Sequence, residues 1–217
     1  MLNLFAQLLD LIYKKHCYFC RSTSDNSIMC KKCFDEIELL SPKNIDCETN
    51  VPVFSASIYG KNMQKMIRGL KYHTKRELAF FQAKLMFNFW NTLTDKKEKY
   101  LIVPVPLFKS RERKRKYNHM QLVAQEFSKL TGYEIKNNLV KRIKDTKPQY
   151  RLTVSERQAN LANAFKVEKK YYNGENILII DDILTTGSTL CEIVNELKRS
   201  GISNITCFTT SCTASHV

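Results

Sequence analysis

The sequence predicts an α/β fold, a mainly parallel sheet with helices on both faces, preceded by a small cysteine-rich module. Apolar runs of strand length alternate with segments whose apolar residues recur every three or four positions. Such alternation is typical of parallel sheets with crossover helices. The cysteines, in contrast, gather in a polar region near the start that is too poor in apolar residues to form much core. We expect residues 1–50 to form the module and residues 51–217 the α/β domain.

Length and charge narrow the class of protein. The chain has 217 residues and a net charge of +14. A field of that sign attracts polyanions such as nucleic acid, anionic lipid or phosphorylated small molecules, although a generally basic proteome is the simpler alternative. No run reaches the roughly 18 apolar residues of a membrane helix. The first 17 residues predict an amphipathic helix rather than an export signal, with peripheral membrane contact as the alternative. We therefore expect a cytoplasmic protein.

The first half of the domain is expected to hold two strands and two helices. The strands cover 51–60 and 100–107, and prolines end the second. Helical spacing of apolar residues marks the two helices between them. These residues are Met63, Met66, Ile67 and Leu70 in the first helix, and Leu78, Phe81, Leu85 and Phe89 in the second.

The second half begins with a basic run at 109–116, followed by a helix that Gly132 ends. We expect a strand over 134–142, then a polar loop with a short helix over 143–165. Apolar strands at 175–182 and 204–210 then flank a last helix that ends at Gly201.

The stretch "IIDDILTTGST" (179–189) carries the strongest chemical signal. A run of hydroxyl residues with Gly187 precedes a helix, so side-chain hydroxyls, backbone N–H groups and the helix dipole can together bind a phosphate monoester. A simple helix cap is the alternative, but a cap needs only one such residue. Asp181 and Asp182 repel each other unless donors satisfy them. Two vicinal sugar hydroxyls supply such donors, and a divalent cation can assist, so the stretch predicts a site for ribose 5-phosphate.

This stretch resembles the phosphoribosyl diphosphate (PRPP) signature of type I phosphoribosyltransferases. The resemblance implies that fold, and it implies PRPP binding together with Mg²⁺. Further blocks, "GLKY" (69–72), "VPVPL" (103–107), 111–119 and 142–165, are similar to the ComF family of competence-associated proteins over nearly the whole chain. The implied PRPP-binding residues are Asp181, Asp182, Thr185, Thr186, Gly187, Ser188 and Thr189.

The resemblance also assigns pyrophosphate binding to the segment after Leu107 and a mobile flap to 142–160. Arginine binds dense anions with paired donors, and alternate residues of an extended segment share one side. The alternatives are a solvated charged face at the start of a helix and, for the flap, ordinary capping or surface hydrogen bonds. The candidates are Arg111, Arg113, Arg115, Gln149 and Arg157.

The chain departs from the family at 115–119, where the family usually has Arg-Gly-Phe-Asn-Gln and this chain has "RKYNH"; Lys116 in place of the glycine puts the local backbone geometry in doubt. Lys71 at a helix end needs no ligand, because the helix dipole already stabilises it. We interpret His73 and His119 as isolated surface or packing residues. Some relatives carry an acid where this chain has Thr185, so the motif itself offers no evident proton acceptor.

Two Cys-x₂-Cys pairs separated by nine residues predict a structural zinc site. Four thiolates complete a tetrahedral shell, so no position stays open for catalysis. In a stretch with so little core, zinc supplies much of the folding energy. Four free thiols are the alternative. The ligands are Cys17, Cys20, Cys30 and Cys33.

The family resemblance implies a factor that handles single-stranded DNA during natural transformation, together with a competence helicase or the inner-membrane DNA channel. Basic residues interleaved with an aromatic ring support DNA contact. The candidates are Lys109, Lys114, Lys116 and Tyr117. Two alternatives stay open: a working phosphoribosyltransferase with an unidentified nitrogenous acceptor, and a regulator in which PRPP is only an effector.

Overall fold

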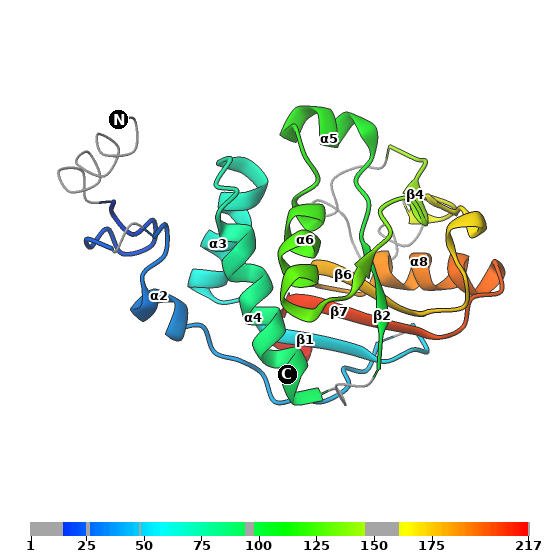
Figure 1. Ribbon diagram of the computed structural model, residues 1–217, viewed down its shortest axis with the longest axis horizontal. Helices are drawn as coiled ribbons and strands as arrows, with labels where there is room; N and C mark the ends of the chain where they lie inside the picture. The colour runs from blue at the N-terminus through cyan, green and yellow to red at the C-terminus, as the bar shows by residue number, and fades with distance from the viewer. Residues whose placement is uncertain (1–14, 25–26, 48, 94–97, 146–160, 217) are drawn as a thin grey trace.

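The computed structural model describes residues 15–24, 27–47, 49–93, 98–145 and 161–216. A twisted sheet forms its centre, and α5 stands above one end of that sheet (Figure 1). The helices are α2 (Lys31–Asp35), α3 (Lys61–Tyr72), α4 (Leu78–Leu93), α5 (Lys109–Arg115), α6 (His119–Thr131), α8 (Ser188–Arg199) and the short 3₁₀ turns η2 (Lys169–Tyr171) and η3 (Ala214–His216). The strands are β1 (Val53–Ile58), β2 (Tyr100–Pro104), β3 (Glu134–Ile135), β4 (Val140–Arg142), β5 (Phe165–Val167), β6 (Asn176–Leu184) and β7 (Ile205–Cys212).

The central sheet has five strands in the order β1-β7-β6-β2-β3, and every neighbouring pair is parallel. The predicted α/β class with a mainly parallel sheet is confirmed. β6 pairs with both β7 and β2, which places the carboxyl end of β6 at the middle of the sheet. Ligands of parallel α/β sheets bind beyond such carboxyl ends.

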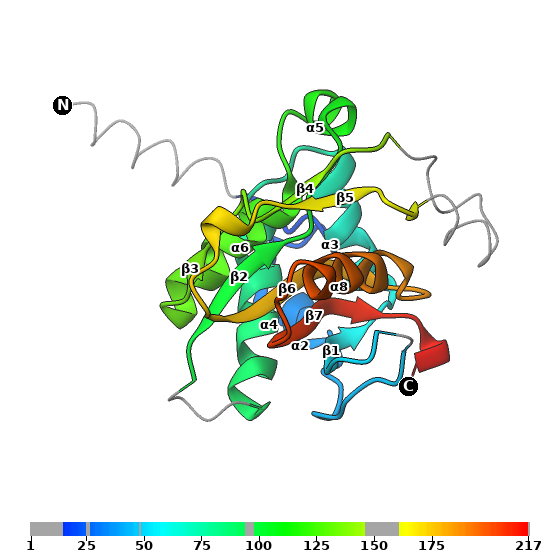
Figure 2. The same cartoon turned by 90° about the vertical axis from the view of Figure 1, so that its right-hand side faces the viewer.

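The two faces of the sheet are covered by different elements, as Figure 2 shows. Leu178 and Ile180 of β6 belong to the core cluster that includes buried residues of α3, α4 and α6. Ile177 and Ile179 belong to the other cluster, with α8 and the β4–β5 pair. This alternation with apolar residues on both sides is what a central parallel strand requires.

The prediction of one strand over 134–142 is wrong. β3 joins the central sheet beside β2, whereas β4 pairs antiparallel with β5 in a separate two-stranded sheet. A turn at Asn137 and Asn138 divides the segment, because asparagine favours turns over strand interiors. The loop predicted up to 165 also ends too late, since Phe165 already opens β5. A three-residue strand is too short to show periodicity.

The cysteine module packs directly against the α/β domain. Cys17, Met29 and Cys33 share a core cluster with α3 and α4. Backbone bonds from Leu40 N to Ala56 O and from Ile45 N to Val53 O lead the chain into β1. The module and the α/β domain are therefore in close contact, and the boundary at residue 50 remains a prediction. The helix predicted within the first 17 residues lies almost wholly outside the described residues. Among the helices that are described, none is long and apolar enough to cross a bilayer.

Candidate functional site

A hollow of about 870 Å³ opens at the carboxyl end of β6 and is lined in part by α5. Its walls come from the end of α3, from α5 and the start of α6, and from the turn between β6 and α8. It brings together segments that lie more than a hundred residues apart in the sequence. Both halves of the predicted ligand site, the acidic strand end and the basic segment, thus face one cavity.

The predicted phosphate cup forms the turn from β6 into α8. Gly187 has a left-handed backbone (φ 75°) and occupies the N-cap position, and no side chain within the described residues caps the helix. Thr185, Ser188 and Thr189 line the hollow with Gly187. Thr186 does not, and its hydroxyl lies 2.8 Å from that of Ser188. The turn therefore offers uncapped amide groups of a twelve-residue helix to the cavity.

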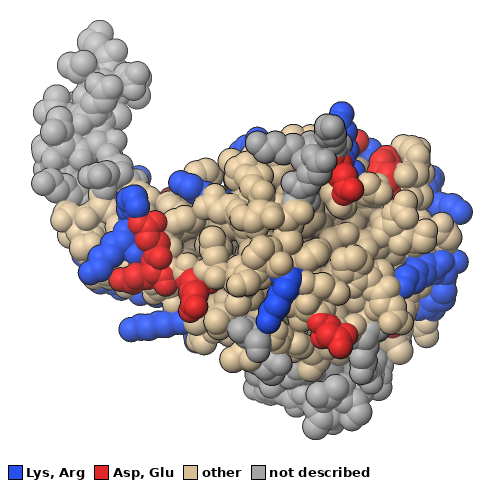
Figure 3. Space-filling view, turned by 90° about the horizontal axis from the view of Figure 1, so that it is seen from below, with Lys and Arg blue, Asp and Glu red and all other residues tan. Residues whose placement is uncertain are grey.

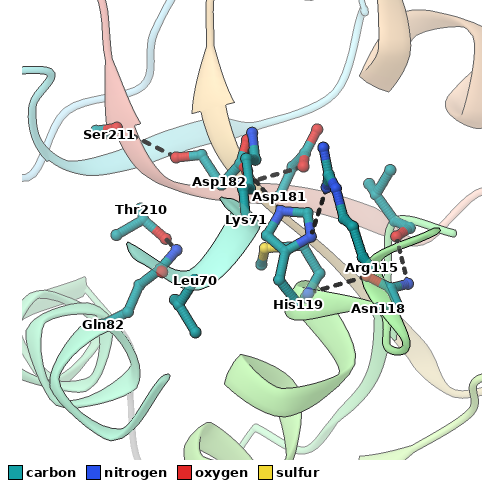
Figure 4. Close-up of polar contacts among 12 residues, drawn as sticks. Leu70, Lys71, Gln82, Arg115, Asn118, His119, Asp181, Asp182, Thr210 and Ser211 are labelled. Carbon is teal, nitrogen blue, oxygen red and sulfur yellow. Dashed lines mark hydrogen bonds and ion pairs between the residues drawn. The ribbon is translucent and has the colours of Figure 1, made fainter. Parts of the chain in front are cut away.

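The two aspartates differ in their surroundings (Figure 4). Asp182 is buried and contacts two partners through the same oxygen: Lys71 Nζ forms an ion pair with Oδ2, and His119 Nε2 lies 2.6 Å from it. Asp181 is partly exposed toward the cavity, and its Oδ1 accepts the backbone N–H of Asp182 at 2.8 Å. Asp182 is thus held by the protein itself, whereas Asp181 keeps acceptor capacity for a ligand.

The pKa values of the pair are driven apart. Burial raises the pKa of Asp181 to about 7, and the charge of Asp182 adds to the effect, against the opposing pull of Lys71. Burial would also raise the pKa of Asp182, but Lys71 and His119 outweigh it, so that the net shift is downward. Asp182 is therefore ionised at neutral pH, while Asp181 titrates near it.

Replacing Asp181 with asparagine is expected to stabilise the ligand-free protein at about pH 8 by roughly 1 to 2 kcal/mol. The folded pKa of Asp181 lies above its unfolded value, so folding favours the protonated form and stability falls as the pH rises from about 4 to 7. Urea unfolding of both proteins at several pH values measures this. The gain should shrink as the pH approaches about 4, and a gain that did not depend on pH would contradict the assignment.

The interpretation of His119 as isolated is wrong, and Lys71 has a partner that the sequence reasoning missed. Both continue apolar stripes at helical spacing, four residues from Val123 in α6 and four from Ile67 in α3. A polar residue on a buried helix face needs a partner, so this spacing could have identified both. The Asp182 carboxylate meets that need for each of them.

The basic segment is a helix, α5, and the extended arrangement expected for its arginines is wrong. Arg111 and Arg115, which lie four residues apart, line the cavity, and Arg113 does not. Arg115 lies with its guanidinium 5.3 Å from the centre of the Tyr72 ring, and its Nη1 is 3.3 Å from His119 Nδ1. A short helix thus delivers two of the three candidates to the site.

Arg142, on β4, joins this cationic wall; it is the first residue of the predicted flap segment and is not among the predicted candidates. Burial and the nearby charge of Arg111 lower its pKa to about 10. Burial also lowers the pKa of Arg111, where Asp145 opposes the shift and Arg115 adds to it. Neighbouring cations disfavour each other's charged form, so an anion that binds between them stabilises both.

The DNA-binding candidates divide in the same manner. Lys114 and Tyr117 line the cavity, while Lys109 and Lys116 do not. The Tyr117 hydroxyl donates to Leu70 O at 2.5 Å. Seen from below, the described part of the face opposite α5 is mostly uncharged, with both acidic and basic side chains scattered over it (Figure 3). Gln149 and Arg157, the flap candidates, lie outside the described residues.

Lys116 keeps the backbone geometry that a glycine would favour, with φ 66° and ψ 2° at the end of α5. A side chain costs about 1 kcal/mol or more in this left-handed region. We expect Lys116→Gly to raise the free energy of unfolding by about 0.5 to 1 kcal/mol, because relief of the left-handed strain exceeds the larger entropy that glycine loses on folding. Chemical denaturation tests this, with Lys116→Ala as the control that removes the charge but keeps Cβ. If the two variants were equally stable, any gain over wild type would come from removing the lysine charge rather than from the glycine backbone.

The four predicted cysteine ligands form one cluster, in which all sulfur atoms lie within 4.8 Å of one another. Cys17 and Cys33 are buried, Cys30 is half-buried and Cys20 exposed. The backbone N–H groups of Phe19 and Cys30 each donate to Cys17 Sγ at 3.4 Å. Such bonds favour the thiolate form that metals bind. Four sulfurs so arranged fit a tetrahedral zinc ion.

Comparison with known proteins gives a family match and several relatives. The family model "Phosphoribosyl transferase domain" matches residues 104–213. Competence protein F of Haemophilus influenzae is 40% identical over 106 residues, which cover 48% of this chain but only 46% of that protein. DNA utilization protein YhgH of Salmonella typhi is 30% identical over 156 residues, covering 70% of this chain and 67% of the relative. Competence protein ComFC of Bacillus subtilis is 28% identical over 138 residues, covering 63% and 53%.

Two solved structures also resemble the chain. One is a hypoxanthine phosphoribosyltransferase from Staphylococcus aureus, with a TM-score of 0.39, 17% identity and coverage of 65% of this chain and 66% of that one. The other is an adenine phosphoribosyl transferase from Trypanosoma brucei, with a TM-score of 0.41, 11% identity and coverage of 90% and 84%.

Proposed function

The chain belongs to the ComF family of phosphoribosyl transferase domain proteins, and on that premise we propose that it binds PRPP and single-stranded DNA as a factor in DNA uptake. One observation carries the proposal: a single cavity joins an acidic strand end, an uncapped helix N-terminus and a cationic wall. These three surfaces match the ribose hydroxyls, the 5-phosphate and the diphosphate of one ligand. The competence and DNA utilization names of the relatives support the cellular role.

The ribose 5-phosphate end fits the turn between β6 and α8. The 5-phosphate would accept hydrogen bonds from the N–H groups at the start of α8 and from the hydroxyls of Ser188 and Thr189. Asp181 would accept hydrogen bonds from the ribose hydroxyls, and it must be ionised to do so. PRPP affinity should therefore rise with pH through about 7.

The diphosphate end fits the opposite wall. Arg111, Arg115 and Arg142 supply planar donors that pair with phosphate oxygens. A diphosphate also chelates Mg²⁺, which favours oxygen ligands and retains water, so we expect the ligand to bind as its magnesium complex.

Single-stranded DNA would bind along the rim of the same cavity, through Lys114 and the ring of Tyr117. We expect Lys114→Ala to weaken binding of an oligonucleotide and to reduce the slope of log affinity against log salt by about 0.7. Filter binding over a salt series measures both. The matched control is Lys129→Ala, on α6, where the lysine is paired with Glu126. If wild-type affinity did not fall as salt rises, or if both variants changed equally, the proposed DNA site would be wrong.

Because Lys114 and Tyr117 share the cavity with the PRPP candidates, occupation by PRPP should also change the DNA affinity. Repeating the titration with saturating PRPP and Mg²⁺ tests whether PRPP acts as an effector. Identical affinities would exclude such coupling.

Phosphoribosyl transfer is the second candidate, and the raised pKa of Asp181 favours it. In that reaction the bond from C1 of the ribose to the diphosphate breaks, and a bond forms from C1 to an acceptor nitrogen. The acceptor loses a proton, which a carboxylate with a pKa of about 7 can accept at physiological pH. Release of pyrophosphate in a screen of nitrogenous bases would support catalysis, and its absence across the screen would leave the binding role.

A further inference from the structure

We propose that His119 is a positioning residue that joins the two ends of the ligand site, tying Arg115 on the diphosphate side to Asp182 on the ribose side. This inference rests on the proposed binding of PRPP. It concerns a residue that the sequence analysis interprets only as a surface or packing histidine. The supporting observation is geometric: the two ring nitrogens of a buried imidazole each face one member of the site.

The partners of the ring determine its tautomer. Asp182 Oδ2, 2.6 Å from Nε2, is a carboxylate oxygen and accepts. Arg115 Nη1, 3.3 Å from Nδ1, belongs to a guanidinium, which only donates. Nε2 must therefore carry the proton, and Nδ1 must present its lone pair to the arginine. Figure 4 shows the ring between these two groups.

The charge of the ring is fixed by the same surroundings. Three charged groups face it: Asp182 from β6, Lys71 from α3 and Arg115 from α5. Burial disfavours the imidazolium, and the two cations disfavour it further, so that the pKa of His119 is lowered despite the carboxylate. A protonated ring would also place an N–H against the Arg115 guanidinium, and the hydrogen bond to Nδ1 would be lost.

This arrangement orients a side chain that would otherwise be mobile. Arg115 lies over Tyr72, a residue that is 64% exposed, and among the described residues its contact to buried His119 is the one that anchors the guanidinium to the protein interior. Asp182 in turn holds the ring through Nε2. An arginine oriented before the ligand arrives loses less entropy on binding, which strengthens its contact with the diphosphate.

The test compares wild type with His119→Gln and His119→Leu. Glutamine retains one donor and one acceptor, whereas leucine has similar bulk and neither. Calorimetric titration with PRPP and Mg²⁺ at about pH 8 should give a similar affinity for His119→Gln and an affinity about tenfold weaker for His119→Leu. Thermal unfolding of each variant shows that it is folded. Equal affinities of all three proteins would overturn the proposal.

A pH series tests whether the ring is neutral while it orients Arg115. Because the pKa of His119 is lowered, the ring should stay neutral from about pH 8 down to about 6.5, where only the ligand and Asp181 titrate. Wild type and His119→Gln should therefore lose affinity in parallel over this range. A steeper fall for wild type would mean that the ring becomes charged there, which would contradict the proposal.

A measurement without ligand keeps this inference distinct from the proposed function. Nitrogen NMR of the histidine rings, assigned by comparison with His119→Gln, should find Nε2 protonated and Nδ1 unprotonated at about pH 7. The guanidinium protons of Arg115 should exchange faster in His119→Leu than in wild type. If wild type bound no PRPP, the proposed function would fail, and these two results would still decide whether His119 positions Arg115. The opposite tautomer would refute it.

Discussion

Replacing Asp182 with alanine is expected to lower the free energy of unfolding by about 3 kcal/mol, a large share of the stability of a single domain. The carboxylate is buried and serves both Lys71 and His119. Its loss leaves a lysine cation, with a side chain only 18% exposed, without the group that compensates its burial. The sequence assigns both aspartates to ligand binding. The structure gives Asp182 a structural role as well.

Urea unfolding at about pH 7 measures this loss, and the exposed pair Lys31–Asp35 on α2 provides the matched control. Asp35→Ala removes a carboxylate from a lysine that is 89% exposed, so its effect should stay within about 0.5 kcal/mol. Adding Lys71→Met to Asp182→Ala should recover part of the lost stability, because no buried cation remains. If Asp182→Ala were as stable as Asp35→Ala, the buried ion pair would not contribute as argued.

Replacing Cys17 with serine is expected to remove the bound zinc and unfold the cysteine module that precedes β1. Cys17 is buried, its sulfur accepts two backbone N–H groups, and three further cysteines complete the set. Zinc binding supplies about 10 kcal/mol or more in small cysteine modules, far beyond what the module's own core contributes. Metal analysis should find about one zinc ion per wild-type chain and little in the variant.

Cys47→Ser is the matched control, since Cys47 lies outside the four-sulfur cluster. It should keep its zinc and its resistance to limited proteolysis. The loss should also reach the α/β domain, because Asn62 donates to Cys33 O and Lys65 to Phe19 O across the contact. A full complement of zinc in Cys17→Ser would remove the assignment, and a folded, metal-free wild type would show that the cluster needs no ion.

The parts of the fold that the sequence predicts well are those with long periodic signals. The helix from Lys61 to Tyr72, the helix that ends at Gly132 and the apolar strand before Asp181 all occur close to the expected bounds. Each spans enough residues for its apolar period to emerge. β3, β4 and β5 have two or three residues each, and pairing with distant segments rather than local pattern determines them.

The site was predictable where one continuous motif forms it and unpredictable where distant segments meet. The turn from Asp181 to Thr189 is read from a single stretch, whereas the partnership of Lys71, His119 and Asp182 joins three elements. The sequence shows which helix faces are buried, and therefore that Lys71 and His119 need partners. It does not show which partner each one reaches. Because α5 is a helix, Arg111 and Arg115 line the cavity and Arg113 does not. This helix likewise depends on the residues at its two ends, Phe108 and Lys116.

Calorimetric titration of PRPP with Mg²⁺ into wild type and Thr189→Asp tests the central claim most directly. An aspartate in the first turn of α8 suits the helix dipole, so the fold should be as stable as wild type. It also places a negative charge where the 5-phosphate is expected. The account predicts one bound PRPP per wild-type chain and no measurable binding to the variant. A wild type that produces no heat, or a variant that binds as tightly as wild type, would contradict it.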